Sequence, residues 1–102
     1  MQPHARANLG QLNLLELLSL DDAAFKQKFA GTPILRTKRR GLLRNVCVAL
    51  GNVGDASALP ALTRAADDPE PLIAEHAKWA IDEISRRLQN EQAPITAIAQ
   101  HG

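Results

Sequence analysis

The fold is decided by two matching stretches, LLRNVCVAL at residues 42–50 and IAEHAKWAI at residues 73–81. The second stretch follows the first at an offset of 31 residues, and both end on an alanine followed by a large aliphatic residue. In each stretch apolar side chains recur at the spacing of one helix face, and a shorter helical segment and a break with proline come before it. A helix pair repeated at about 30–40 residues is typical of an α-solenoid, in which each pair buries its apolar face against the next.

Shorter patterns on either side of these stretches complete a fold of about five helices. Leucines recur every three residues over 9–18, and Ser19 is expected to cap a second helix. Gly31 should end that helix, so the third helix should begin near Thr37 or Lys38.

The composition favours helices and excludes several other classes of protein. The chain has 102 residues, of which 45% are hydrophobic, 23% charged and 3% aromatic, so it has the size and balance of one globular domain. Its 17 alanines and 15 leucines favour helices, whereas an all-β fold would need more β-branched and aromatic residues. No apolar run is long enough to span a membrane and no leader-like segment opens the chain, so we expect a cytoplasmic protein.

Two short segments between the matching stretches, LGNVGD at 50–55 and LPAL at 59–62, resemble the HEAT-like repeats of the phycobilin-lyase type. With the internal repeat, they predict an all-α fold, a HEAT-like α-solenoid fragment of about five helices over residues 9–88. Residues 1–8 are expected to form a disordered tail, and residues 89–102 a frayed one.

The charges are segregated along the sequence. Residues 23–54 contain no acid and carry seven basic side chains, whereas the rest of the chain has a net charge of −6. The whole chain sums to only +1, so its overall charge hides this basic segment. Such segregation points to a polyanionic partner rather than to a requirement of the fold.

The densest part of this segment gives the candidate nucleic-acid-binding residues, which are Arg36, Lys38, Arg39, Arg40, Arg44 and Asn45. On a helix wheel, Arg40 and Arg44 lie opposite the apolar face that runs from Leu42 to Val53. Cations at a helix start oppose the helix dipole by about 0.3–1 kcal/mol, a cost that a polyanionic partner would offset. Because the chain has so few aromatic residues, we expect phosphate contacts rather than stacking on bases. A solvated helix start is the alternative interpretation.

Other side chains that could carry chemistry are expected to have structural roles. Cys47 is the only cysteine, which excludes an internal disulfide and a multi-cysteine metal site within the chain. We interpret Cys47 as a packing residue, His76 as a half-buried histidine with a hydrogen-bond partner, and Trp79 as a packing residue of the core or of a domain interface. The sequence shows no catalytic triad, carboxylate pair or phosphate-binding loop, so it predicts no catalytic and no metal-binding residue.

One block is more specific than a general helical repeat. The stretch FKQKFAGTPILRTKRRGLLRNV at 25–46, together with ALGN at 49–52 and DPEPL at 68–72, resembles the C-terminal helical domain of epoxyqueuosine reductase. The similarity runs from about residue 14 to residue 84. Ala74 departs from the pattern of that family, which favours arginine at this point of the repeat.

The resemblance implies a role in tRNA modification. Enzymes of this family complete queuosine synthesis at the wobble position of certain tRNAs by reducing an epoxide, with cobalamin and iron–sulfur clusters held by an N-terminal catalytic part. The resemblance implies that this chain is a non-catalytic domain with no cofactor of its own, whose partners are the tRNA anticodon arm and that catalytic part. The alternative is a HEAT-repeat scaffold for protein interaction, in which the basic run meets an acidic surface of a partner protein.

Overall fold

The computed structural model describes the backbone of residues 3–101 and the side chains of residues 10–90. The elements in chain order are α1 (Pro3–Leu18), α2 (Asp22–Phe29), α3 (Ile34–Val53), the 3-10 turn η1 (Ala56–Ala58), α4 (Leu59–Ala65) and α5 (Pro71–His101). Within residues 3–101 there is no strand, which confirms the all-α prediction for that part of the chain.

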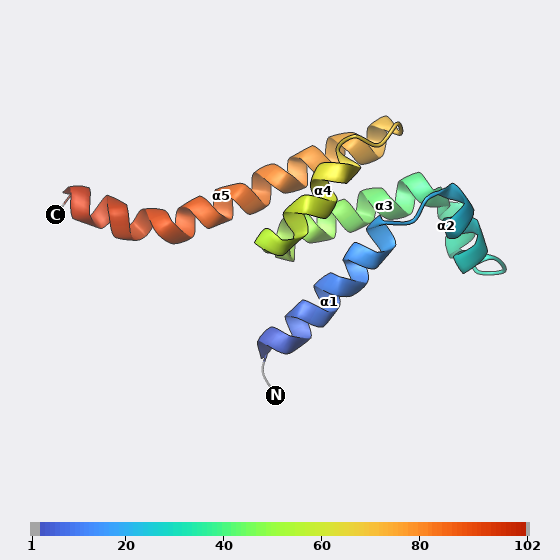
Figure 1. Ribbon diagram of the computed structural model, residues 1–102, viewed down its shortest axis with the longest axis horizontal. Coiled ribbons are helices and arrows are strands. Elements are labelled where there is room, and N and C mark those ends of the chain that lie inside the picture. Colours follow the sequence, from blue (N-terminus) through green and yellow to red (C-terminus); the bar gives the residue numbers. More distant parts are fainter. Residues whose placement is uncertain (1–2, 102) are drawn as a thin grey trace.

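The centre of the fold is the contact between α3 and α5, the most extensive between any two elements (Figure 1). Helix α4 packs against α5, α1 packs across α3, and α2 contacts the N-terminal part of α3. The largest fully buried side chains come from the three elements at this centre: Leu43, Cys47, Leu50, Leu62, Ile73 and Ile84. The arrangement is compatible with a HEAT-like solenoid, which stays a prediction.

The terminal helices extend beyond the predicted domain limits. The backbone of α1 is helical from Pro3, and that of α5 is helical to His101, so both helices run into the segments expected to be tails. The side chains of residues 1–9 and 91–102 lie outside the described part of the structure. The domain limits of 9–88 therefore stay a prediction.

Local sequence signals account for several helix boundaries. Asp21, rather than the predicted Ser19, caps α2, because its carboxylate accepts a hydrogen bond of 2.8 Å from the Ala24 backbone. Ser19 instead donates its hydroxyl to the Glu16 carbonyl at 2.7 Å at the end of α1. Gly31 adopts a φ of +77° after α2, as a helix-ending glycine can, and α5 begins at Pro71.

The buried face of α3 is rotated from the predicted one. Val53, placed on the apolar face by the helix wheel, is 74% exposed, whereas Cys47 and Gly51 are buried. The cause is the close approach of α5: a Cβ atom on Gly51 would overlap Trp79 Cζ3 and lie 3.1 Å from the Ala80 Cα. Gly51 thus provides space for the indole, and Trp79 is a packing residue as predicted, with 38% of its surface exposed.

The C-terminal end of α3 is held by side chains from both terminal helices. Arg87 of α5 donates hydrogen bonds to the Gly51 and Gly54 carbonyls at 2.5 and 2.6 Å. The buried Gln11 of α1 accepts from the Asp55 backbone at 2.8 Å and donates to the Asp55 carboxylate and the Ser57 hydroxyl. Carbonyls that an isolated helix would leave unpaired are satisfied here.

Candidate nucleic-acid interface

All six predicted contact residues lie on α3, and four of them are exposed: Arg36, Lys38, Arg40 and Asn45. Among the described side chains, ion pairs join only Arg39 to Asp68 and Arg86 to Glu83. The cations of Arg36, Lys38 and Arg40 therefore have no anionic partner within that part of the chain. Exposed cations of this kind are available to contact phosphate groups.

Lys38 interrupts α3 with an unusual backbone conformation. Its φ of 65° and ψ of 160° are non-helical, and it is the only non-glycine residue with positive φ among the described residues. For a residue with a side chain this region costs on the order of 1–3 kcal/mol. Lys38 thus separates a first arm of α3, residues 34–37, from a second arm, residues 39–53. The sequence predicts a helix start near Thr37 or Lys38, whereas α3 begins at Ile34; the predicted start falls at the junction between the two arms.

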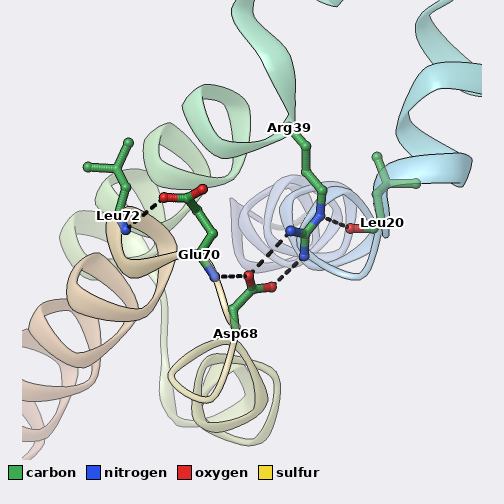
Figure 2. A network of polar contacts seen from close by, with 5 residues as sticks. All are labelled: Leu20, Arg39, Asp68, Glu70 and Leu72. Carbon is green, nitrogen blue, oxygen red and sulfur yellow. Dashed lines mark hydrogen bonds and ion pairs between the residues drawn. The ribbon is translucent and has the colours of Figure 1, made fainter.

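The Arg39 side chain is half-buried and is held by two other segments of chain (Figure 2). Its Nε donates to the Leu20 carbonyl at 2.7 Å, and its two terminal nitrogens donate to the Asp68 carboxylate. Asp68 also accepts a hydrogen bond from the Glu70 backbone at 2.9 Å, in the turn before α5. The side chains of Arg39 and Asp68 are only 18% and 10% exposed. Arg39 is therefore not one of the exposed cations, although the sequence places it among them.

The pKa values of this pair follow from the same contacts. The hydrogen bonds from Arg39 hold the pKa of the Asp68 carboxyl below its ordinary range, against an opposing effect of burial. The same pairing raises the pKa of the Arg39 guanidinium. Both groups stay charged near neutral pH, so the Asp68 carboxylate neutralises one cation of the basic run.

Arg44 also differs from its prediction, since it is half-buried. Its Nε is buried without a hydrogen-bond partner among the described residues. The rotated buried face of α3 explains this position, because Cys47 and Gly51 bring the core around toward Arg44. Asn45, the next residue, is exposed as predicted for a surface contact.

Helix α2 contributes a cation that the predicted set lacks. Lys26 and Lys38 line one groove between α2 and α3, with Phe25 and Leu35 as its apolar members. Lys38 and Arg40 line a second groove toward the turn before α5, together with the acidic residues Asp22, Asp68 and Glu70. We call Lys26, Arg36, Lys38 and Arg40 the basic surface. The absence of acids over residues 23–54 is the sequence signal that could have added Lys26 to the candidate set.

The described residues do not fit an iron–sulfur cluster or another metal centre. Cys47 is fully buried, and burial raises the pKa of its thiol to about 11, as expected of a packing residue rather than a ligand. His76 donates from Nδ1 to the Leu72 carbonyl at 2.8 Å, which confirms its interpretation as a half-buried histidine with a partner. Within the described residues no group of three histidines, cysteines or acids could hold a metal ion, and no helix could cross a membrane.

Comparison with known proteins finds relatives of one kind of enzyme. The chain is 40% identical to the epoxyqueuosine reductase of Alicycliphilus denitrificans over 85 residues, which cover 76% of this chain and 24% of that protein. It is 37% identical to the Salmonella typhimurium enzyme over 91% of this chain and 23% of that protein, and 39% identical to the Bacillus subtilis enzyme over 70% and 19%. The chain matches a C-terminal domain of epoxyqueuosine reductase. It spans about a quarter of the length of these curated relatives. No family model and no solved structure matches the chain.

Two of the sequence blocks on which the expected resemblance rests meet in the fold. The block at 25–46 contains Arg39, and the block at 68–72 contains Asp68 and Glu70. The two blocks meet in the contacts of Figure 2, where α3 is joined to the turn that begins α5. Residues that are 29 positions apart in the chain thus form one structural unit beside the basic surface.

Proposed function

We propose that this chain binds tRNA as the anticodon-arm-binding, non-catalytic domain of a cytoplasmic epoxyqueuosine reductase. The relatives are named for a reductase, and epoxyqueuosine is a modified nucleoside of tRNA. The observation that carries the proposal is the set of exposed cations without anionic partners, Arg36, Lys38 and Arg40, in a chain similar to these enzymes. Cobalamin and iron–sulfur clusters would belong to the catalytic part of such an enzyme.

The basic surface is suited to the phosphate backbone rather than to unstacked bases. Phe25 is buried and Phe29 is half-buried against it, so neither ring offers an open face for stacking. Lysine and arginine side chains can bind phosphates from several directions without reading base identity. Arg44 and Asn45, at the margin of the same helix, would add weaker contacts.

A salt titration tests the class of partner. The chain is titrated into a fluorescently labelled tRNA with a queuosine-type anticodon arm at several salt concentrations. Contacts to phosphates predict that the logarithm of the affinity falls linearly with the logarithm of the salt concentration, by roughly 0.7–0.9 per phosphate neutralised. No binding at low salt would contradict the proposal.

A pair of triple variants tests the location. Replacing Arg36, Lys38 and Arg40 together by glutamate should abolish tRNA binding. The matched control replaces Arg64, Lys78 and Arg86, which are also exposed, and has the same change in net charge. Arg87 is left out of the control because it binds the end of α3. Equal losses from both variants would show that binding is diffuse rather than localised on α3.

A second candidate, a scaffold for protein interaction, is supported by exposed apolar side chains. Leu12 is 58% exposed and Val53 is 74% exposed, while Trp79 presents more than a third of its surface. This candidate would be favoured if the chain bound a partner protein tightly and showed no affinity for tRNA in the salt titration.

A further inference from the structure

The first and second arms of α3 carry different parts of the basic surface. Arg36 belongs to the first arm, which is exposed at every residue over 34–37, and Arg40 belongs to the second. The conformation of Lys38, at the junction, sets the direction of one arm relative to the other. It therefore also sets the spacing between the cations of Arg36 and Arg40.

A strained residue keeps its conformation only where its surroundings determine it. On the C-terminal side of Lys38, the next residue is Arg39, whose guanidinium is fixed to the Leu20 carbonyl and to Asp68. On the N-terminal side, Leu35 shares a groove with the buried Phe25 of α2. Without the fixed position of Arg39, nothing among these contacts would prevent Lys38 from relaxing to helical dihedral angles.

We propose that Asp68 is a positioning residue of the basic surface: by holding Arg39, it keeps Lys38 in its left-handed conformation and fixes the spacing between Arg36 and Arg40. The effect on RNA rests on the proposed function, whereas the effect on Lys38 does not. The proposal reverses the expectation from charge alone. A carboxylate beside a basic surface weakens its potential, so its removal should strengthen phosphate binding unless the carboxylate also sets the geometry.

Melting temperatures test whether Asp68 holds Lys38. Lys38→Gly and Lys38→Ala both delete the ammonium group, but only glycine adopts a φ of 65° without strain. In the wild-type background the glycine variant should therefore melt a few degrees above the alanine variant. In an Asp68→Asn background this difference should vanish or reverse, because a relaxed helical residue favours alanine. The same difference in both backgrounds would overturn the proposal.

Arg39→Lys provides a second background if Asp68→Asn does not fold. It keeps the positive charge but loses the planar fork that binds Asp68 and Leu20 together. The difference between glycine and alanine at position 38 should again vanish. A difference that persists would overturn the proposal here as well.

Affinity for the same labelled tRNA at one fixed salt concentration tests the consequence for binding. Asp68→Asn should bind about three- to tenfold more weakly, the loss expected when one or two side chains lose their preorganisation. The matched control is Glu83→Gln, which also removes one negative charge and one ion pair but lies on α5 away from the basic surface. It should bind as tightly as the wild type or slightly more tightly.

Asp68→Asn binding as tightly as the wild type, or more tightly, would overturn the positioning role. Absence of binding by the wild-type chain would overturn the proposed function and the positioning role with it. The melting temperatures would in that case still decide whether Asp68 holds Lys38, so the two failures are distinguishable.

Discussion

The two ends of α3 are built in opposite ways. At its C-terminal end the Arg87 guanidinium binds the last carbonyls, a favourable place for a cation in the helix dipole. At its N-terminal end Lys38 and Arg40 stand where cations are unfavourable, and Lys38 adds backbone strain. The C-terminal end has the features of an element selected for stability. The N-terminal end accepts several costs to stability, which an anionic partner would explain.

The largest expected effect is the loss of buried contact at the C-terminal end. Leu50→Ala removes a fully buried side chain and should cost about 2–5 kcal/mol of the free energy of unfolding, enough to unfold much of a domain this small. Leu35→Ala, near the other end and 37% exposed, should cost less than about 1 kcal/mol. Urea unfolding followed by circular dichroism measures both. A similar loss of unfolding free energy for the two variants would contradict the difference between the two ends of α3.

The next effect concerns the cation at the C-terminal end. Arg87→Met should lower the free energy of unfolding by about 1–3 kcal/mol, because two carbonyls lose a charged donor. Arg86→Met is the matched control: the Arg86 side chain is 62% exposed and pairs with Glu83 on the surface, so its loss should cost about 0–1 kcal/mol. Equal costs for the two arginines in thermal unfolding would show that the contacts of Arg87 do not stabilise the end of α3.

At the N-terminal end, a substitution that removes a side chain should raise stability instead of lowering it, because glycine relieves backbone strain. Lys38→Gly should leave the chain more stable than Lys38→Ala by about 1 kcal/mol, since only glycine relieves the strain of positive φ. Both variants should bind tRNA more weakly than the wild type, because both lose the same ammonium group. Greater stability of the alanine variant would mean that Lys38 is helical in solution and that the N-terminal end carries no strain.

The smallest effect is a dependence of stability on acid pH. The pKa of Asp68 is lowered below its ordinary value of 3.8 by Arg39, so the folded state favours the carboxylate. Its contribution is complete above that ordinary value and is lost as the pH falls through the lowered pKa. Asp68→Asn should therefore flatten the decline in melting temperature below about pH 4. An unchanged slope would show that the pair adds no stability that depends on pH.

The sequence was sufficient to predict the parts of this comparison that depend on periodicity. The spacing of apolar residues located the core, including Leu50 and Ile73, and the acid-free segment located the basic surface. It gave the wrong face for Val53, because a helix wheel counts an apolar side chain as buried and ignores the space that Gly51 leaves for Trp79.

The sequence could not predict the contacts of Arg39 either. Its partners at Leu20 and Asp68 are 19 and 29 residues away in the chain, and neither pairing follows from helix periodicity. In the sequence Arg39 differs in no way from Arg40, yet Arg39 is half-buried in an ion pair and Arg40 is exposed. The difference arises because the chain brings Leu20 and Asp68 beside Arg39 and not beside Arg40.

The close contact between Trp79 and Gly51 also gives the chain an optical property. Trp79 is its only tryptophan and it has no tyrosine, so its near-ultraviolet fluorescence comes from one indole at the C-terminal end of α3. The wavelength of maximum emission therefore reports on the contact between α3 and α5 without an added label. A tRNA on the basic surface would sit at the other end of α3, away from this fluorophore. A shift in the Trp79 emission wavelength on tRNA binding would then show that binding at one end of α3 changes the packing at the other end.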